Sequence, residues 1–328
     1  MESIRRVMSH IVVGLLLFSG NSRVVQAETE VGVDLGLRTD YLRWNIADPT
    51  GIPNILSELT WKNVDSQYLN AHATFKDGNF NLRGNYGYGR ITQGYNQDSD
   101  YNGNNRTSEF SRSNNKSNGD HVSDAKLGIG IEFEGLKVPG FQIIPWVGLS
   151  RHQQNLKMTN GVQTIPALGP EFLKDLNSSY DAQWNGPWAG FNAQLELARK
   201  IVIRASFEHH WTNYIGQGNW NLRECLAHPK SFTHNAKGNG IELDLSADVE
   251  LHTNLILSFR MTYSSWLTDA GTSTVHLPAD FYTKRDSQGR PCLDEVVPLE
   301  DQVFNFSTRL NEVKWQSRSY LIGINMRL

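Results

Sequence analysis

The chain has 328 residues, of which 39% are hydrophobic and 20% are charged, and its formal net charge is -3. This length suits one large domain or two small ones. The charge balance argues against a nucleic-acid binder, because such proteins are usually basic, and we expect no nucleic-acid partner.

The first 27 residues predict a secretory signal peptide. Arg5 and Arg6 precede an apolar run at residues 11–18, and Val25-Gln26-Ala27 offers a small-residue cleavage site. This segment is too short to anchor the chain, and no other stretch approaches the roughly 18 apolar residues of a membrane helix. We therefore expect an exported mature chain, residues 28–328, that forms a single domain and can enter a membrane only as a barrel.

A two-residue rhythm of apolar and polar side chains recurs along the mature chain and predicts roughly ten strands. In chain order the expected strands lie near residues 31–38, 58–75, 80–88, 124–133, 141–156, 189–197, 201–211, 240–251, 255–263 and 320–328. In the second strand we expect one apolar face throughout, with Leu59 and Trp61 on the same side as Leu69, Ala71 and Phe75.

The segment at residues 240–251 shows the rhythm most clearly. Apolar residues from Ile241 to Leu251 occupy the odd positions, and the even positions carry four carboxylates: Glu242, Asp244, Asp248 and Glu250. A body that is apolar outside and charged inside is most simply a transmembrane β-barrel.

Short and long connections alternate along the chain. The short turns are expected at residues 76–79, 138–140, 199–200 and 252–254, and the long polar loops at residues 95–120, 158–180, 216–237 and 269–312. This alternation is typical of outer-membrane barrels, which have short periplasmic turns and long extracellular loops. We therefore predict an all-β, ten-stranded antiparallel transmembrane barrel in the bacterial outer membrane, with a charge-paired interior favoured over an open channel.

The two cysteines, Cys225 and Cys292, fall in the last two long loops, on the same rim. In an oxidising compartment a disulfide between them would tie these loops together, and two unpaired thiols are the alternative. Metal binding through this pair is not favoured, and we expect no metal site.

Asp98 and Asp100 stand two residues apart where the second long loop begins. On extended backbone two such side chains point the same way. A carboxylate pair can hold an attacking water or share one proton. Aspartate is also common in loops, so the alternative is a pair that only faces solvent.

Several stretches, taken in order, resemble the omptins, the outer-membrane aspartyl-type endopeptidases of Gram-negative bacteria. They are Leu56-Ser57-Glu58-Leu59-Thr60-Trp61-Lys62, the glycine-rich segment 84–100 that ends in Asp98-Ser99-Asp100, Pro187-Trp188-Ala189-Gly190 and the aromatic run Tyr263-Ser264-Ser265-Trp266. The resemblance covers nearly the whole mature chain, although the loops diverge. It implies a ten-stranded barrel with an active-site groove between the loops above the membrane.

The resemblance also implies roles for particular residues. In omptins an aspartate pair from the second loop faces an Asp-x-His dyad from the fourth loop, and Asp98 and Asp100 take the positions of the pair. Residues 214–237 contain no Asp-x-His. His228 is the nearest match for the histidine and leaves Leu226 in place of the aspartate. Glu224 is a possible substitute acid, and His234 is a second candidate histidine.

Two further features follow from the resemblance alone. Asp40 lies where omptins carry an acid that selects basic side chains at the cleaved bond. Omptins also depend on lipopolysaccharide, so we expect outer-membrane lipid and lipopolysaccharide as partners of a monomeric barrel, and no other cofactor.

Three functions are therefore open from the sequence. The first is a surface endopeptidase that uses Asp98, Asp100 and a loop histidine to cleave a protein or peptide substrate beside a basic residue. The second is a barrel that has lost the dyad and acts as an adhesin or binding surface. The third is a narrow porin.

Overall fold

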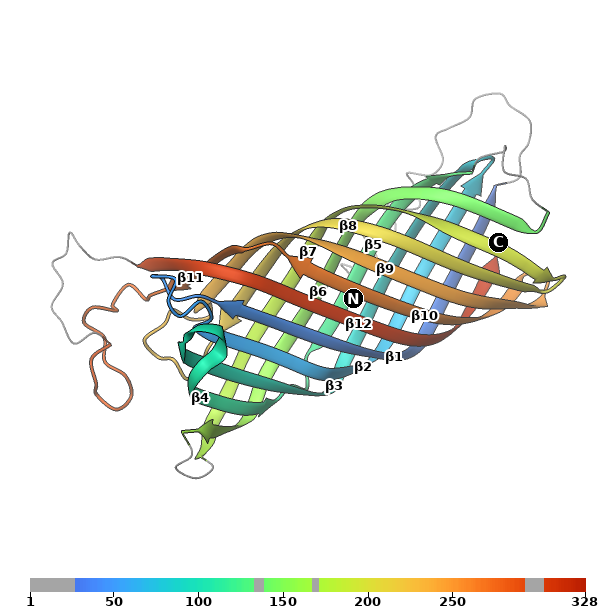
Figure 1. Ribbon diagram of the computed structural model, residues 1–328. Helices are drawn as coiled ribbons and strands as arrows, with labels where there is room; N and C mark the ends of the chain where they lie inside the picture. The colour runs from blue at the N-terminus through green and yellow to red at the C-terminus, as the bar shows by residue number, and fades with distance from the viewer. Residues whose placement is uncertain (1–26, 133–138, 167–170, 293–303) are drawn as a thin grey trace.

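A computed structural model of the chain describes residues 27–132, 139–166, 171–292 and 304–328, so the predicted signal peptide lies outside the described residues except for Ala27. The described chain forms one long barrel of antiparallel strands (Figure 1). Its elements are β1 (Glu28–Ile46), β2 (Ser57–Asp77), β3 (Phe80–Gly103), a 3-10 turn η1 (Asn104–Arg106), β4 (Thr107–Lys116), β5 (His121–Ile131), β6 (Phe141–Ile165), β7 (Glu171–Ala198), β8 (Ile201–Asn219), β9 (Phe232–His252), β10 (Leu255–Thr268), β11 (Gly271–His276) and β12 (Asn305–Arg327).

The barrel closes between its first and last strands. β1 pairs antiparallel with β12, so that Leu35 lies opposite Ile322, and β1 pairs with β2 on its other side. β4 and β5 both lie between β3 and β6, and β10 and β11 both lie between β9 and β12. Because each of these two pairs shares one position, the twelve strands of the described residues fill ten positions around the barrel, which confirms the predicted fold class.

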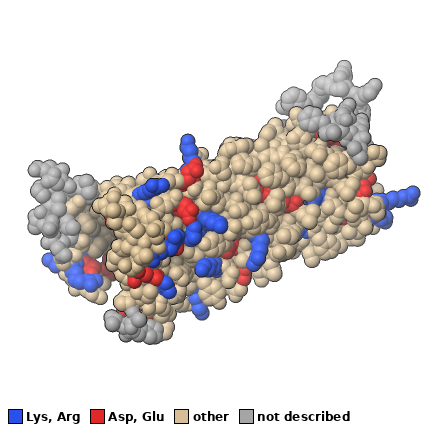
Figure 2. Space-filling model, viewed as in Figure 1, with Lys and Arg blue, Asp and Glu red and all other residues tan. Residues whose placement is uncertain are grey.

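Apolar side chains cover the outside of the barrel. On β9, Leu245 is 53% exposed, whereas the neighbouring Ser246 and Asp248 are each 3% exposed and point inward. The same outward apolar face continues on β1 and β12 through Leu35 and Ile322. Such a surface is stable only against lipid, because exposed apolar area in water is unfavourable. In Figure 2 uncharged side chains cover most of the visible face.

None of the described residues belongs to a helix long and apolar enough to span a membrane.

The strands continue well beyond the membrane. β6 has 25 residues and β7 has 28, whereas a barrel strand crosses a bilayer with about 9–11. Much of the predicted loop at residues 95–120 is therefore the end of β3 and β4, and much of 158–180 is the end of β6 and the start of β7. The loop predictions were too long because both faces of an extension above the membrane can be polar. The backbone hydrogen bonds between strands then continue, but the sequence lacks the alternation of apolar and polar residues from which a strand is predicted.

An aromatic layer fills the barrel below the extracellular rim. It consists of buried side chains from six strands: Trp44, Trp61, Tyr180, Trp184, Tyr214, Trp266 and Trp315. The rings of Trp266 and Trp315 are stacked with centroids 5.1 Å apart, and the centroid of Trp184 lies 4.5 Å from that of Tyr214. These close ring contacts, in a layer that excludes solvent, separate the rim from the lower lumen.

Below the aromatic layer the interior is polar and charge-paired, as expected. Lys126 Nζ lies 2.9 Å from a Glu208 carboxylate oxygen and also pairs with Glu242, while Arg83 contacts Glu208 at 2.5 Å. These groups line a cavity of about 500 Å³ that reaches the periplasmic ends of the strands near Thr29. Pairing lets the charges stay ionised inside the barrel, because an unpaired charge there is costly.

Candidate functional site

A second cavity, of about 600 Å³, lies at the extracellular rim above the aromatic layer. We call it the rim cavity. Its walls come from the ends of β1, β2, β3 and β9, from β11, and from two loop segments at residues 220–226 and 286–290. The lining side chains with acid, base or charged groups are Asp98, Asp100, Arg223, Glu224, His234, Asp286 and Arg290.

Asp98 and Asp100 reach the rim cavity because the strands shift register below them. On the lower part of β3 the odd-numbered residues point inward, so that Arg83 contacts Glu208 in the lumen and Ile91 is buried. Thr92 and Gln93 are then both exposed, opposite a register irregularity of β2 around Asp65. Above this bulge the even-numbered residues point inward.

The same irregularity reverses the faces of β2. Asn63 has a positive φ of 50°. Below Asn63 the odd-numbered side chains of β2, such as Leu69, point outward, and above Asn63 the odd-numbered side chains point inward. Leu59 and Trp61 are therefore buried, at 1% and 0% exposure, whereas Leu69 is 42% exposed. The prediction that these residues share one apolar outer face was wrong, because a single bulge moves every later side chain to the opposite face.

The two carboxylates lie side by side in a polar frame. Asp98 is opposite Leu59 on β2 and Ser113 on β4, and Asp100 is opposite Ser57 and Ser111. The side chains of Ser57 and Ser111 hydrogen-bond to the Asp100 carboxylate. Both aspartates lie on β3 beyond the first roughly 9–11 residues that cross the bilayer, and so they stand above the membrane.

Burial raises the pKa values of both aspartates. Removal from solvent, followed by the charge of Asp100, raises the pKa of Asp98 to about 7, and the Arg223 guanidinium opposes this rise. Removal from solvent also raises the pKa of Asp100, while its bond from Ser57 and the charge of Arg223 lower it. One of the two carboxyl groups can therefore exchange a proton near neutral pH, which is the property of a general acid or base.

His234 on β9 faces the same cavity. It is fully buried, its Nδ1 lies 2.8 Å from the Tyr180 hydroxyl, and its ring packs against Trp44 with centroids 4.7 Å apart. Its Nε2 has no hydrogen-bond partner among the described residues. Burial lowers the pKa of His234 to about 3, so the ring is neutral. A buried nitrogen without a hydrogen-bond partner is unusual in a folded protein, and here it belongs to a residue that lines the cavity.

The structure does not bring His228 to the carboxylates. His228 is exposed, its Nδ1 lies 2.8 Å from Asn219 Oδ1, and it does not line the rim cavity. The segment turns back where Ala227 N donates to the His276 carbonyl, so Leu226 faces the cavity and His228 lies beyond it. His234 takes the place in the cavity that the sequence analysis expected for His228.

Glu224 lines the rim cavity as expected, but its carboxylate is engaged. Its Oε2 accepts a 2.5 Å hydrogen bond from the backbone N–H of Ser287. Phe232, two residues before His234, also lines the cavity, at the position where an Asp-x-His dyad would have its aspartate. Glu224 is therefore part of the wall without replacing that aspartate beside His234.

Asp40 lies away from the rim cavity. It is 2% exposed and accepts hydrogen bonds from Arg38 Nε at 2.8 Å and from the Trp315 indole N–H at 2.7 Å. β1 continues to Ile46, so the cavity is reached by Trp44 and Ile46 rather than by Asp40. Asp40, expected from the resemblance to select basic side chains, therefore does not line the cavity, and its carboxylate is bonded to Arg38 and Trp315.

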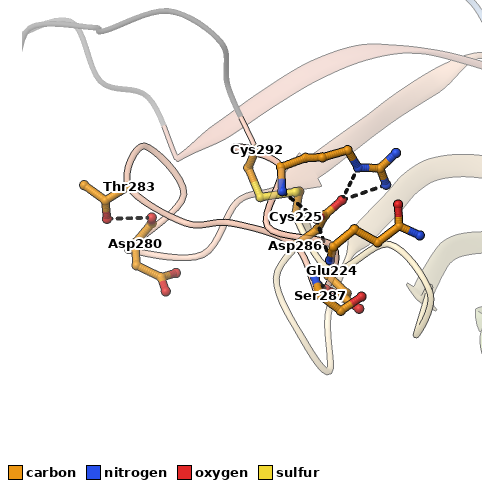
Figure 3. The surroundings of a disulfide bond; sticks show 9 residues. Glu224, Cys225, Asp280, Thr283, Asp286, Ser287 and Cys292 are labelled. Carbon is orange, nitrogen blue, oxygen red and sulfur yellow. Dashed lines mark hydrogen bonds and ion pairs between the residues drawn. A yellow bond between two sulfur atoms is a disulfide. The ribbon is translucent and has the colours of Figure 1, made fainter.

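A disulfide joins Cys225 to Cys292, with Cα atoms 5.4 Å apart, and it lies beside the rim cavity (Figure 3). It connects the segment 220–231 between β8 and β9 to the segment that follows β11. Among the residues that the structure describes, no group of three or more histidine, cysteine or acidic side chains is placed to hold a metal ion.

A closed antiparallel barrel with an apolar exterior and a polar interior defines a bacterial outer-membrane β-barrel protein. A protein-family model described as "Pom: Protochlamydia outer membrane protein" matches residues 32–328. The chain therefore belongs to the Protochlamydia outer membrane protein family, and its location is the outer membrane.

A likeness to one solved outer-membrane structure agrees with this fold. The crystal structure of the outer membrane protease OmpT from Escherichia coli matches with a TM-score of 0.70 and 10% sequence identity, over 94% of this chain and 99% of that chain. The translocator domain of the autotransporter NalP from Neisseria meningitidis matches with a TM-score of 0.37 and 9% identity, over 100% of this chain and 95% of that chain. At these identities the likeness to OmpT shows the fold alone. No curated protein matches the sequence.

Proposed function

We propose that the protein is a surface endopeptidase whose hydrolytic site is the rim cavity. The observation that carries this proposal is that Asp98, Asp100 and His234, whose buried Nε2 has no hydrogen-bond partner among the described residues, all line one cavity of about 600 Å³. Such a volume lies within the roughly 300–1,000 Å³ of small-ligand sites. It suits a few side chains of an extended peptide.

Each group has a defined part in the proposed reaction. A water held by Asp98 and Asp100 attacks the peptide carbonyl carbon and gives a proton to Asp98. With Tyr180 donating to Nδ1, the His234 Nε2–H donates a hydrogen bond to the developing oxyanion. The C–N bond then breaks, and Asp98 returns the proton to the leaving amine.

The charges around the cavity favour a cationic substrate side chain. Four acidic residues line it, Asp98, Asp100, Glu224 and Asp286, against two basic ones, Arg223 and Arg290. Arg290 is paired with Asp286 at 2.7 Å. We therefore keep the preference for basic sites, with the cavity acids in the selecting role in place of Asp40, and we keep lipopolysaccharide as a required component of a monomeric enzyme.

Cleavage of a dibasic peptide tests this proposal. The refolded mature protein, supplied with lipopolysaccharide, should cut the peptide, and Asp98→Asn and His234→Ala should each lower kcat/KM by about 10²- to 10⁴-fold because each removes a proton-transfer or oxyanion group. His228→Ala is the matched control, since this exposed histidine lies outside the cavity, and it should keep the wild-type rate. Equal rates for wild type and Asp98→Asn would remove the catalytic role.

A binding function is the second candidate, and Phe232 favours it. An apolar ring stands where a dyad aspartate would orient the histidine. In that case the wild-type protein binds the dibasic peptide without cutting it, and the double variant Asp98→Asn with Asp100→Asn weakens the affinity measured by calorimetry.

A further inference from the structure

A compact hairpin after β11 forms one wall of the rim cavity. Its ends are joined by a β-bridge between Arg285 and Pro291 and by a 2.9 Å bond from Cys292 N to the Lys284 carbonyl. Its tip turns at Gly289, which has a positive φ of 78°. We call residues 284–292 the strap.

The strap is held together by its own bonds. The Asp286 carboxylate accepts from the backbone N–H groups of Gln288 and Arg290 at 2.9 Å, and from Arg290 Nε at 2.7 Å. These contacts are internal to the strap. These bonds hold the turn of the strap in one shape.

Two contacts tie the strap to the opposite loop. One is the Cys225–Cys292 disulfide, and the other is the 2.5 Å bond from Ser287 N to Glu224 Oε2. Figure 3 shows the disulfide and, near it, Glu224 and Ser287 close together. Adjacent to this junction, Asp286, Ser287, Gln288 and Arg290 face the cavity that contains Asp98 and Asp100.

We propose that the strap determines which substrates reach Asp98 and Asp100, and that the disulfide sets its position. This inference rests on the proposed hydrolytic function for the nature of the substrate. With the disulfide intact, the strap limits the cavity to extended peptide segments and excludes folded proteins. A dithiol reductant opens it: its two thiols give two electrons and two protons to the sulfur pair, which leaves two cysteine thiols and an oxidised dithiol.

Carboxyl labelling tests the strap without any need for enzymatic activity. The mature protein is treated with a water-soluble carbodiimide and an amine, and labelled peptides are measured by mass spectrometry. Reduction with dithiothreitol, or the Cys225→Ser and Cys292→Ser double variant, should raise the labelling rate of Asp98 and Asp100 about tenfold, because the strap opens locally. Asp77 in the β2–β3 turn is the internal control and should not change.

Glu224→Gln provides a milder test that leaves the disulfide in place. It weakens the acceptor for Ser287 N and should raise the labelling of Asp98 and Asp100 in the unreduced protein, by less than reduction does. Unchanged labelling in the reduced protein, in the double serine variant and in Glu224→Gln would overturn the inference, provided that each protein keeps the wild-type β-sheet circular dichroism.

A cleavage experiment separates this inference from the proposed function. The ratio of folded-protein cleavage to short-peptide cleavage should rise on reduction. Increased labelling with no cleavage in either redox state would support the strap and contradict the endopeptidase. Cleavage with a constant ratio and constant labelling would support the endopeptidase and contradict the strap.

Discussion

Arg223 is the cation that opposes the raised pKa values of the aspartate pair. The charged and titratable groups that line the rim cavity with Asp98 are Asp100 on the same strand, Arg223 and Glu224 from the segment after β8, His234 on β9, and Asp286 and Arg290 on the strap. From β4, the charge of Glu109 raises the pKa of Asp100. Among these groups Arg223 lowers the pKa of both aspartates, against the larger effect of burial. The base in the proposed reaction is ionised Asp98, so kcat/KM should rise as the pH passes through about 7. We call this rise the acid limb of the pH profile, and its midpoint belongs to the coupled pair of aspartates.

Arg223→Gln should move this acid limb to higher pH. Removal of the cation leaves burial and repulsion unopposed, so the pKa of Asp98 rises and more alkali is needed to ionise it. The measurement is the pH profile of kcat/KM on the dibasic peptide. Lys230→Gln removes a cation from the same loop outside the cavity and should leave the limb in place. A limb that stays fixed or moves to lower pH in Arg223→Gln would contradict this assignment.

His234 could have been assigned to the interior from the alternation of β9 in the sequence. The even-numbered residues of β9 point inward from Asp248 and Ser246 upward, and continuing that phase leads to His234. The resemblance favours His228 as the nearest match for the dyad histidine, with His234 in the same predicted loop as the second candidate. The strand begins at Phe232, inside the segment predicted as loop, so the phase could not be extended that far from the apolar pattern alone.

At the scale of elements, the long strands have a lower part that crosses the membrane and an upper part that extends above it. In the lower part lipid on one side and the lumen on the other impose a strict alternation, which is why the number of barrel positions and the short turns could be predicted. In the upper part that constraint ends, and the bulges in β2 and β3 exchange inward and outward faces. Simple alternation from Tyr86 and Tyr88, both exposed on the outer face, would place Asp98 and Asp100 outside. The bulge therefore brings the candidate site into the cavity.

Lysine substitutions on β9 test whether the lower part of this strand lies in the membrane. Leu245→Lys places a charge on the lipid-facing surface near the middle of the membrane and should cost about 2–4 kcal/mol of unfolding free energy. Asn235→Lys is the matched control on the same strand, because this exposed residue lies above the membrane, and its effect should stay within about 0.5 kcal/mol. Urea unfolding in lipid vesicles, followed by tryptophan fluorescence, measures both. Similar costs for the two variants would contradict the membrane position of β9.

At the scale of the whole molecule, the aromatic layer divides the barrel into a lower chamber and a rim. Its rings come from β1, β2, β7, β8, β10 and β12, so no single stretch of sequence marks it, and only the closed barrel brings them together. Sequence analysis could predict a filled interior from the strand number and the charges. It could not predict that tryptophan and tyrosine form the barrier, because their depth depends on the bulges and on the register of distant strands.

Conductance of the purified mature protein in a planar lipid bilayer tests most directly the central claim that function resides at the rim above a closed lumen. Flotation with lipid vesicles first establishes that the protein has inserted. The aromatic layer predicts no stepwise current from the inserted wild-type barrel. Reproducible ohmic steps from the wild-type protein would contradict the claim and would favour a narrow porin instead.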